Sequence, residues 1–194
     1  MESTPRNICV FCGSSSGTDP AFRTAAVALG SAIVGAGHRL VFGGGHVGLM
    51  GVVADEVLAR GGEVTGVMTE QLVGLEVAHQ GLTELDVQPT MHRRKARMAE
   101  LADGVVVLPG GFGTLDEAFE LLTWNQLGLI SVPIVFLDVD GFFAPLFDFI
   151  AGSAAAGFMK DHHGGLAQRT ESAEAAVEMA SGGAPAYTPK WVDR

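Results

Sequence analysis

The sequence predicts an α/β protein with a Rossmann-like, doubly wound parallel sheet and helices on both faces, folded as one domain over residues 1–181 with a C-terminal tail at 182–194. Two observations support this. Short apolar segments alternate along the chain with longer segments of helical periodicity, which favours right-handed crossovers between parallel strands. The apolar segments are nearly continuous in Val, Ile and Leu, which is typical of strands buried on both faces.

Six short runs of β-branched and apolar residues are predicted to be strands. The run at 104–108 is the strongest, and the run at 82–87 is the weakest. The predicted strands are Ile8–Cys12, Arg39–Phe42, Glu63–Val67, Leu82–Val87, Gly104–Leu108 and Val132–Leu137.

Six helices are predicted around these strands. The first has the clearest boundaries, because Asp19 is a typical N-cap residue and Pro20 suits the first helical position. It should end near Val34, before two glycines. The other predicted helices are Gly48–Arg60, Met91–Ala102, Thr114–Leu127, Pro145–Ala155 and Glu171–Ala180.

Composition and charge narrow the function classes. A net charge of −10 argues against a general nucleic-acid binder. The N-terminal residues lack the charged and then apolar pattern of a signal peptide, and the longest apolar stretch, 128–137, is too short to span a membrane. We therefore expect a cytoplasmic protein with neither a nucleic-acid nor a membrane partner. The two cysteines, Cys9 and Cys12, exclude a disulfide framework and are expected to be buried thiols.

Three predicted strands end in glycine-rich turns, at 13–17, 43–48 and 109–114. Ligands of open α/β sheets bind beyond the carboxyl ends of the strands, and helix N-termini that follow such turns hold phosphate groups. Three such turns at one edge favour a phosphate-bearing ligand. The sequence contains neither a Walker loop nor, in the first turn, the dinucleotide fingerprint, so neither of these nucleotide sites is supported.

The helix predicted at 91–102 carries four of the twelve Lys and Arg residues. Its periodicity places Arg94 on the apolar face with Met98, while Arg93 and Arg97 share the solvated face. An inward arginine needs a carboxylate or phosphate partner, since an unpaired buried charge is costly. The alternatives for Arg94 are a side chain that snorkels from the edge of the apolar stripe, or a purely structural ion pair.

Glu117 is the acidic candidate, and two interpretations of it stay open. Thr114 and Glu117 have the spacing of a capping box, which would make Glu117 a helix cap. The same position would also hold a carboxylate beside a bound sugar phosphate. Asp116 is the second acidic candidate, and Glu76 carries little signal of its own.

Two motifs together are similar to one known family. The segment Pro109–Glu117 matches the pattern PGGxGTxxE, and Met91–Ala96 resembles the family's MHERKA segment. This combination resembles the LONELY GUY (LOG) family of cytokinin riboside 5'-monophosphate phosphoribohydrolases, which older descriptions call lysine decarboxylase-like. The resemblance extends from Cys9 to Phe143. Arg93 stands where the family has Glu, which we expect to alter surface or interface charge rather than the chemistry.

The resemblance implies an enzyme that hydrolyses the N-glycosidic bond of an AMP-like nucleoside 5'-monophosphate, N6-modified or not, and releases free base and ribose 5-phosphate without cofactor or metal. It also implies a homodimer, with a hexamer left open, and sites near the subunit interface. The family's essential Arg and Glu correspond to Arg94 and Glu117. The first two glycine-rich turns add Ser14 and Gly44 to the substrate-binding candidates. The positions that correspond to the family's substrate contacts are Glu76, Arg94, Lys95, Gly110, Gly111, Phe112, Gly113, Thr114, Leu115, Asp116 and Thr123.

Two other functions are compatible with parts of the sequence. A molybdenum-cofactor carrier would share the fold and bind its cofactor without turnover, and the pairing of Arg94 with Glu117 favours the hydrolase over it. An amino-acid decarboxylase would need a lysine for pyridoxal phosphate, and the chain has only Lys95, Lys160 and Lys190.

Two smaller features have ordinary structural interpretations. We expect His162 and His163 to be surface residues, because the sequence shows no supporting cluster of metal ligands around them. Trp124 is expected to lie in the core or in a subunit interface.

Overall fold

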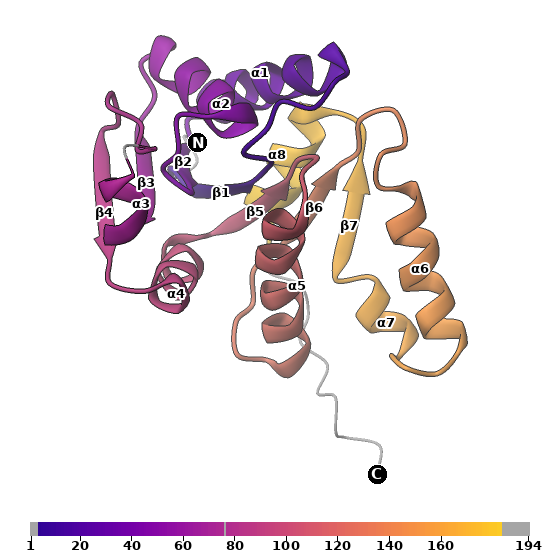
Figure 1. Cartoon of the computed structure of the whole chain (residues 1–194). Coiled ribbons are helices and arrows are strands. Elements are labelled where there is room, and N and C mark those ends of the chain that lie inside the picture. The colour runs from indigo at the N-terminus through magenta and orange to yellow at the C-terminus, as the bar shows by residue number, and fades with distance from the viewer. Residues whose placement is uncertain (1–3, 76, 184–194) are drawn as a thin grey trace.

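Seven parallel strands form one sheet in the order β4-β3-β2-β1-β5-β6-β7 (Figure 1). The computed structural model describes residues 4–75 and 77–183. The order runs outward in both directions from β1, so the sheet is doubly wound, as predicted. The strands are β1 (Asn7–Phe11), β2 (Arg39–Phe42), β3 (Val64–Thr69), β4 (Glu84–Gln88), β5 (Gly104–Val107), β6 (Ile134–Leu137) and β7 (Ala167–Thr170).

Helices cover both faces of the sheet (Figure 1). One face packs against α1 (Pro20–Gly35), α2 (Gly48–Ala59) and α8 (Ala173–Ser181), and the other against α4 (Met91–Leu101), α5 (Phe112–Leu127) and α6 (Ala144–Ala155). Successive β1 residues alternate between the two cores, with Ile8 on the α1 side and Cys9 on the α5 side. Two short helices, α3 (Glu70–Gly74) and α7 (Asp161–Gly164), complete the described part of the chain.

The predicted elements are all present, with ends displaced by two residues or fewer. Asp19 caps α1 as predicted, because its carboxylate accepts a hydrogen bond of 2.9 Å from the Ala21 N–H. At α8 the predicted start was two residues early, since Ser172 is the N-cap and accepts from the Ala175 N–H. The sequence did not predict α3, α7 and β7. The β7 strand lies at the sheet edge and has no continuous apolar run.

The burial of several single side chains was also predicted from the sequence. Cys9 and Cys12 are free and buried, and Trp124 is half-buried against the core on the α5 side, both as predicted. His162 is exposed, but the prediction for His163 was wrong: it is buried and its ring meets the Gln126 amide at 3.1 Å. Arg97 is only half-exposed, because it pairs with Asp86 of β4 as well as with Glu100.

Within residues 4–75 and 77–183, no helix combines the length and apolar character needed to cross a bilayer. Most of the predicted tail, residues 184–194, lies outside the described residues.

Candidate active site

A cavity of about 240 Å³ lies at the carboxyl ends of β1, β2 and β5, where the strand order reverses. This is the position at which open α/β sheets bind their ligands. Its lining includes seven of the sequence-predicted site residues, namely Ser14, Arg94, Gly111, Phe112, Gly113, Thr114 and Glu117. Five further lining residues were not among the candidates: Val10, Cys12, Gly13, Gly43 and Met50. Cys12, Gly13 and Gly43 continue the predicted strands, so their place in the chain could have identified them.

The glycine-rich turns pack against one another at backbone distance. The Gly13 N–H donates to the Pro109 carbonyl at 3.1 Å, and the Leu49 N–H donates to the Gly13 carbonyl at 3.0 Å. A Cβ on Gly110 would lie 2.1 Å from Thr114 Oγ1. Gly48 has a φ of +60°, and a Cβ there would lie 2.3 Å from the Ser14 backbone. Glycine is therefore required where these turns meet.

The N-terminus of α5 opens into the cavity without a side-chain cap. Its N-cap is Gly111, and the first hydrogen bond from this turn is donated by the Leu115 N–H to the Gly111 carbonyl. The N–H groups of Phe112, Gly113 and Thr114 therefore have no carbonyl partner within the helix. They stand at the positive end of the helix dipole, in the lining of the cavity. This arrangement suits an anion such as a phosphate.

Arg94 projects inward from α4 and is 8% exposed. Its Nε donates to the Val67 carbonyl at 2.8 Å, and one terminal nitrogen donates to the Gly43 carbonyl at 3.3 Å. The other terminal nitrogen donates to Glu117 Oε1 at 3.0 Å and contacts Met91 Sδ at 3.3 Å. The prediction of an inward arginine with a carboxylate partner is confirmed, and the snorkelling alternative is wrong.

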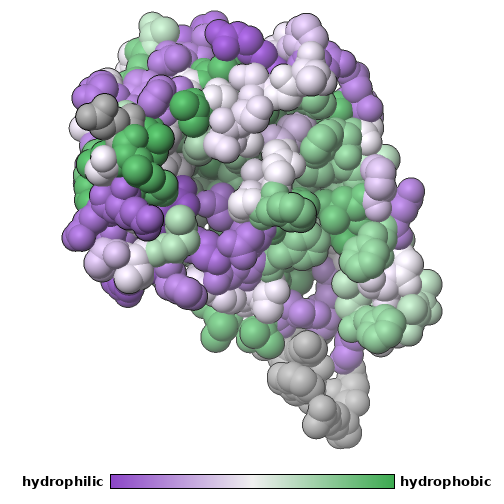
Figure 2. All heavy atoms as spheres, in the orientation of Figure 1, coloured by the Kyte–Doolittle hydropathy of each residue, from purple (hydrophilic) through white to green (hydrophobic). Residues whose placement is uncertain are grey.

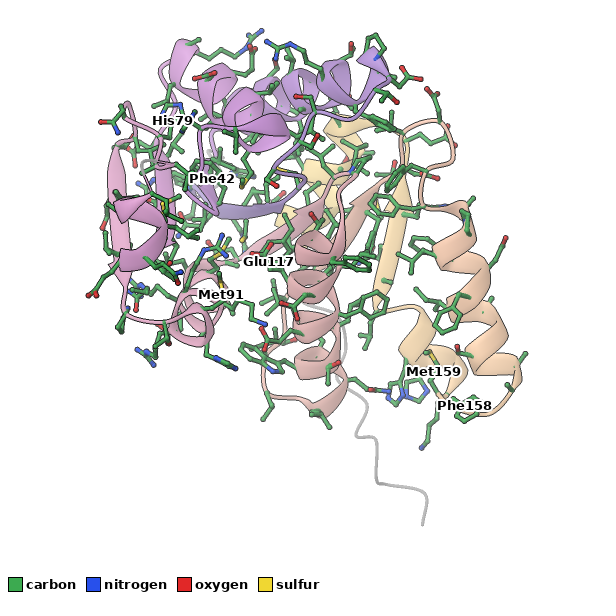
Figure 3. All side chains as sticks on the ribbon, in the orientation of Figure 1. Phe42, His79, Met91, Glu117, Phe158 and Met159 are labelled. Carbon is green, nitrogen blue, oxygen red and sulfur yellow. The ribbon has the colours of Figure 1, made fainter. Side chains whose placement is uncertain are left out.

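Glu117 projects from α5 on the side that faces α4 (Figure 3). Its side chain is 15% exposed. Burial raises the pKa of its carboxyl above the ordinary value, and the charge of Arg94 and the hydrogen bond that it donates oppose this rise. The capping-box interpretation was wrong, because α5 begins at Phe112 and Thr114 already lies inside its first turn. The N-cap residue of α5 is a glycine without a side chain, and Glu117 does not cap the helix. Its carboxylate can therefore face a ligand in the cavity.

Two thiols lie close to this carboxylate. Burial raises the pKa of both Cys9 and Cys12, and the negative charge of Glu117 adds to the rise. Both thiols therefore stay protonated and neutral at physiological pH. Cys12 lines the cavity as a small, weakly polar group.

Lys95 and Asp116 do not line the cavity. The Lys95 ammonium pairs with Asp116 at 2.9 Å and with Glu120 at 3.1 Å, which ties α4 to the outer side of α5. Burial lowers the pKa of Lys95, but the hydrogen bonds that the ammonium donates to its two carboxylate partners outweigh this and hold the pKa above the ordinary value. Contact between Lys95 and a substrate would require the ammonium to leave this pair.

The remaining candidates lie elsewhere. Thr123 is exposed on another side of α5, where its hydroxyl donates to the Phe119 carbonyl at 2.8 Å and it lines a separate cavity of about 120 Å³. Gly44, Gly110 and Leu115 are not in the lining, although Gly110 supports Thr114. Glu76 lies outside the described residues. Among the described residues, no group of three or more His, Cys, Asp or Glu side chains is placed to hold a metal ion.

Known proteins match the chain over most of its length. Residues 50–180 match the family model described as "Possible lysine decarboxylase". A cytokinin riboside 5'-monophosphate phosphoribohydrolase of Rhodococcoides fascians is 46% identical over 157 residues, which cover 80% of this chain and 79% of that protein. A protein of the same name from Arabidopsis thaliana is 44% identical over 162 residues, which cover 82% of this chain and 75% of that protein.

Solved structures show where else the fold occurs. The molybdenum cofactor carrier protein of Chlamydomonas reinhardtii is 20% identical, with a TM-score of 0.69 over 90% of this chain and 95% of that chain. At this identity the likeness concerns the fold alone. The family model covers more than half of the chain, and the relatives above are similar over most of both lengths, so the chain belongs to the LONELY GUY (LOG) family.

Proposed function

We propose that the protein hydrolyses the N-glycosidic bond of adenosine 5'-monophosphates, with or without an N6 substituent, and releases free base and ribose 5-phosphate. One observation carries this proposal. A buried carboxylate, Glu117, is held by Arg94 in the wall of a cavity that also contains the uncapped N-terminus of α5. The printed names of the relatives, which are phosphoribohydrolases of cytokinin riboside 5'-monophosphates, agree with this chemistry.

The substrate would be anchored by its phosphate at the start of α5. The N–H groups of Phe112, Gly113 and Thr114 provide donors there, and the helix dipole favours the anion. Gly111 and Gly113 have no heavy atom within 4 Å of an added Cβ, so a ligand can approach this backbone closely. This anchor is independent of the base, which leaves the other half of the nucleotide to reach Glu117.

Bond cleavage would then proceed through a cationic sugar. As the bond between C1' and the base nitrogen breaks, positive charge develops on the ribose ring, and a nearby carboxylate stabilises it. Water adds to C1', its oxygen stays with ribose 5-phosphate, and the base leaves with a proton. Glu117 also accepts the hydrogen bond that orients the attacking water. No step needs a metal ion or a cofactor.

Arg94 would act mainly through Glu117. Its guanidinium is fixed by the carbonyls of Val67 within β3 and of Gly43 directly after β2, so it presents a hydrogen-bond donor at a defined place. The positive charge opposes the effect of burial and favours the ionised carboxylate. In this arrangement Arg94 both orients the catalytic group and preserves its charge.

The assay for this proposal is direct. Purified protein is incubated with AMP and with N6-isopentenyl AMP, and the free base is measured by chromatography. We expect base from at least one nucleotide, and a loss of about 10²- to 10³-fold in kcat for Glu117→Gln. Failure of folded wild-type protein to release base from either substrate would contradict the hydrolase, and full activity of Glu117→Gln would contradict the role of the carboxylate.

We also propose that the enzyme is a homodimer that acts in the cytoplasm. The support is a hydrophobic surface over α5 and α6 (Figure 2). Within α5 and directly after it, the side chains of Phe119, Leu127 and Leu129 are exposed, as is Thr123. Because Thr123 faces away from the cavity of its own subunit, it could contact a substrate only in a neighbouring subunit. Light scattering should give twice the monomer mass, and a monomer would overturn this proposal.

A pyridoxal-phosphate decarboxylase receives no support from the described lysines. Lys95 is bound to two carboxylates outside the cavity, and Lys160 is the N-cap residue of α7 and does not line the cavity either. Lys190 lies beyond the described residues. The carrier function of the fold neighbours likewise receives no specific support from this site.

A further inference from the structure

The glycine-rich turn after β2 is held from outside the cavity by a second segment of the chain. This segment, residues 77–81, lies between α3 and β4, and we call it the strap. The His79 N–H donates to the Gly44 carbonyl at 2.8 Å, and the His46 N–H donates to the Val77 carbonyl at 3.1 Å. The His46 ring also donates to the Val77 carbonyl, from Nδ1 at 3.0 Å. An isolated antiparallel bridge joins the two segments as well, so the strap pairs with the turn as a short strand would.

The ring of His79 ties the strap to α2 (Figure 3). Its Nδ1 accepts a hydrogen bond of 3.0 Å from the Gly81 N–H, so the ring is neutral and carries its proton on Nε2. Nε2 then donates to Asp55 Oδ1 at 2.9 Å. Asp55 belongs to α2, which begins at Gly48, within the same glycine-rich turn. The turn, α2 and the strap therefore hold one another in a closed ring of contacts.

This ring of contacts includes one group that orients the candidate active site. The turn begins at Gly43, whose carbonyl accepts a hydrogen bond of 3.3 Å from a terminal nitrogen of Arg94. The other terminal nitrogen of Arg94 donates to Glu117 at 3.0 Å. Gly43, Arg94 and Glu117 line the cavity, whereas the strap does not. A shift of the turn would therefore reach the carboxylate through a single side chain.

The two carbonyls that fix the arginine are held in different ways. Val67 lies inside β3 and is paired with Asp86 of β4, so the sheet fixes its carbonyl. Gly43 lies one residue beyond the end of β2, outside the pairing of β2 with β3. The next residue, Gly44, has a φ of +78°, a conformation that glycine adopts freely but that local sterics do not enforce. The hydrogen bonds of the strap replace the missing strand pairing at this point.

We propose that His79 is a positioning residue for Arg94. By tying the strap to Asp55, it fixes the turn whose first carbonyl orients the guanidinium. This inference rests on the proposed function, because Arg94 acts there through Glu117. The phosphate anchor at the start of α5 belongs to another turn and does not contact the strap. Loss of His79 should therefore lower kcat and leave KM nearly unchanged.

The test breaks the contact between His79 and Asp55 from either side. His79→Ala and Asp55→Ala are compared with the wild type for kcat and KM on AMP and on N6-isopentenyl AMP. Small displacements of catalytic groups are costly, so we expect each variant to lower kcat about fivefold with KM within about twofold. The Asp55 side chain is 73% exposed, so Asp55→Ala should fold even if His79→Ala does not.

Conservative variants identify which hydrogen bond of the ring matters. His79→Gln keeps an amide that can donate to Asp55, and it should recover at least half of the wild-type kcat. His79→Asn keeps an oxygen that can accept from the Gly81 N–H, but its side chain is too short to reach Asp55 and should not restore kcat. Recovery with Asn but not with Gln would overturn the role of the contact with α2.

Glu63→Ala is the matched control. Glu63 forms an exposed ion pair of 2.8 Å with Arg39 at the start of β2, the end of that strand away from the cavity. Its loss removes a surface contact of similar exposure and should change the free energy of unfolding, measured in urea, about as little as Asp55→Ala does. The kcat of Glu63→Ala should stay at the wild-type value. An equal loss of kcat in Glu63→Ala and Asp55→Ala would show that the strap acts only through general stability.

A double variant tests whether the effect passes through Arg94. A Cβ at Gly43 already displaces the guanidinium, so His79→Ala combined with Gly43→Ala should have nearly the kcat of Gly43→Ala alone. Multiplied losses would overturn the inference. A rise in KM with unchanged kcat would overturn it too, because the strap would then act on substrate binding.

Crystal structures of the wild type and of Asp55→Ala separate this inference from the proposed function. We expect the Gly43 carbonyl to move beyond hydrogen-bond distance of Arg94 in the variant, and an unchanged contact would overturn the positioning role of His79. If the wild-type protein released no base, the proposed function would fail by itself, and the two structures would still decide whether His79 positions Arg94.

Discussion

Two neighbouring residues of α4 form ion pairs with α5, and the two pairs lie in opposite environments. Arg94 and Glu117 are 10% and 15% exposed at their side chains and meet inside the cavity wall. Lys95 reaches Asp116, which is 61% exposed, and Glu120 on the outer side of the same helix. The Lys95 side chain is itself only 14% exposed, so the two pairs differ mainly in their carboxylates, which are buried in the inner pair and reached by water in the outer one.

This difference in exposure gives the two ion pairs different roles. In the inner pair, burial raises the pKa of the carboxylate, and only the arginine and its carbonyl contacts keep the ionised group in place. In the outer pair, water screens the charges, and the pair does little more than connect two helices. Breaking the inner pair should therefore reduce both activity and stability more than breaking the outer pair does.

The largest effect is expected for Arg94→Ala. Glu117 would be left buried without its partner, which should lower the free energy of unfolding by about 3–5 kcal/mol. Loss of its orientation should also reduce kcat by at least about 100-fold. Urea denaturation and the base-release assay measure the two effects. Arg93→Ala, on the exposed side of the same helix, is the control and should leave both unchanged.

A further variant would test the cause of this loss. If an unpaired carboxylate is the reason, Arg94→Ala combined with Glu117→Gln should be more stable than Arg94→Ala alone. Equal stability of the two variants would show that the lost arginine contacts, rather than the stranded charge, account for the effect.

Gly43→Ala should disturb the same pair from its backbone side. A Cβ at Gly43 would lie 2.3 Å from a terminal nitrogen of Arg94, so the guanidinium must move. Because small displacements of catalytic groups are costly, we expect kcat to fall about 10- to 100-fold with a smaller change in stability. Gly35→Ala is the control, since an added Cβ there meets nothing within 4 Å. Wild-type activity of Gly43→Ala would show that the position of Arg94 is not critical.

The pH dependence of the wild-type activity tests whether burial or the charge of Arg94 has the larger effect on the pKa of Glu117. The proposed mechanism needs the ionised form of Glu117, whose pKa burial raises, so activity should fall as the pH drops through a value above that of an ordinary glutamate. The pH profile of kcat/KM measures this midpoint. A midpoint at or below the ordinary glutamate value would mean that the Arg94 charge outweighs burial.

Much of this site could be predicted from the sequence, because several of its features depend only on residues within one helix, strand or turn. The glycine turns, the inward side of Arg94 and the buried β1 each depend on spacing within one element, and the structure agrees with them. The meeting of Arg94 with Glu117 depends on the sheet order, which no local pattern contains. Gly43 could have been named as a lining residue from its place in the glycine-rich turn at 43–48, but its role, which is to make room for a side chain 51 positions away, depends on the sheet order.

Predictions from the sequence were wrong or incomplete where the local pattern and the tertiary structure favoured different outcomes. Thr114 and Glu117 fit a capping box, but the helix begins at Phe112, since the glycine turn ends earlier than the polar pattern suggests. The edge strand β7 was missed because it carries only a short, mixed run of residues. His163 was expected at the surface, yet α7 and the end of α5 bury it. In each case the surrounding tertiary structure decided the outcome.

The smallest effect is expected for Lys95→Ala, and it separates two roles for this lysine. Its pairs are partly exposed, so their loss should lower the free energy of unfolding by at most about 1 kcal/mol. If Lys95 only joins α4 to α5, KM and the affinity for ribose 5-phosphate should change by less than about threefold. If instead it leaves its carboxylate partners to bind the substrate, as the family resemblance implies, both constants should weaken far more than the stability does. Glu120→Ala removes one of the same ion pairs without removing the ammonium, so a loss of ribose 5-phosphate binding in Lys95→Ala but not in Glu120→Ala would assign the lysine to the substrate rather than to the link between the helices.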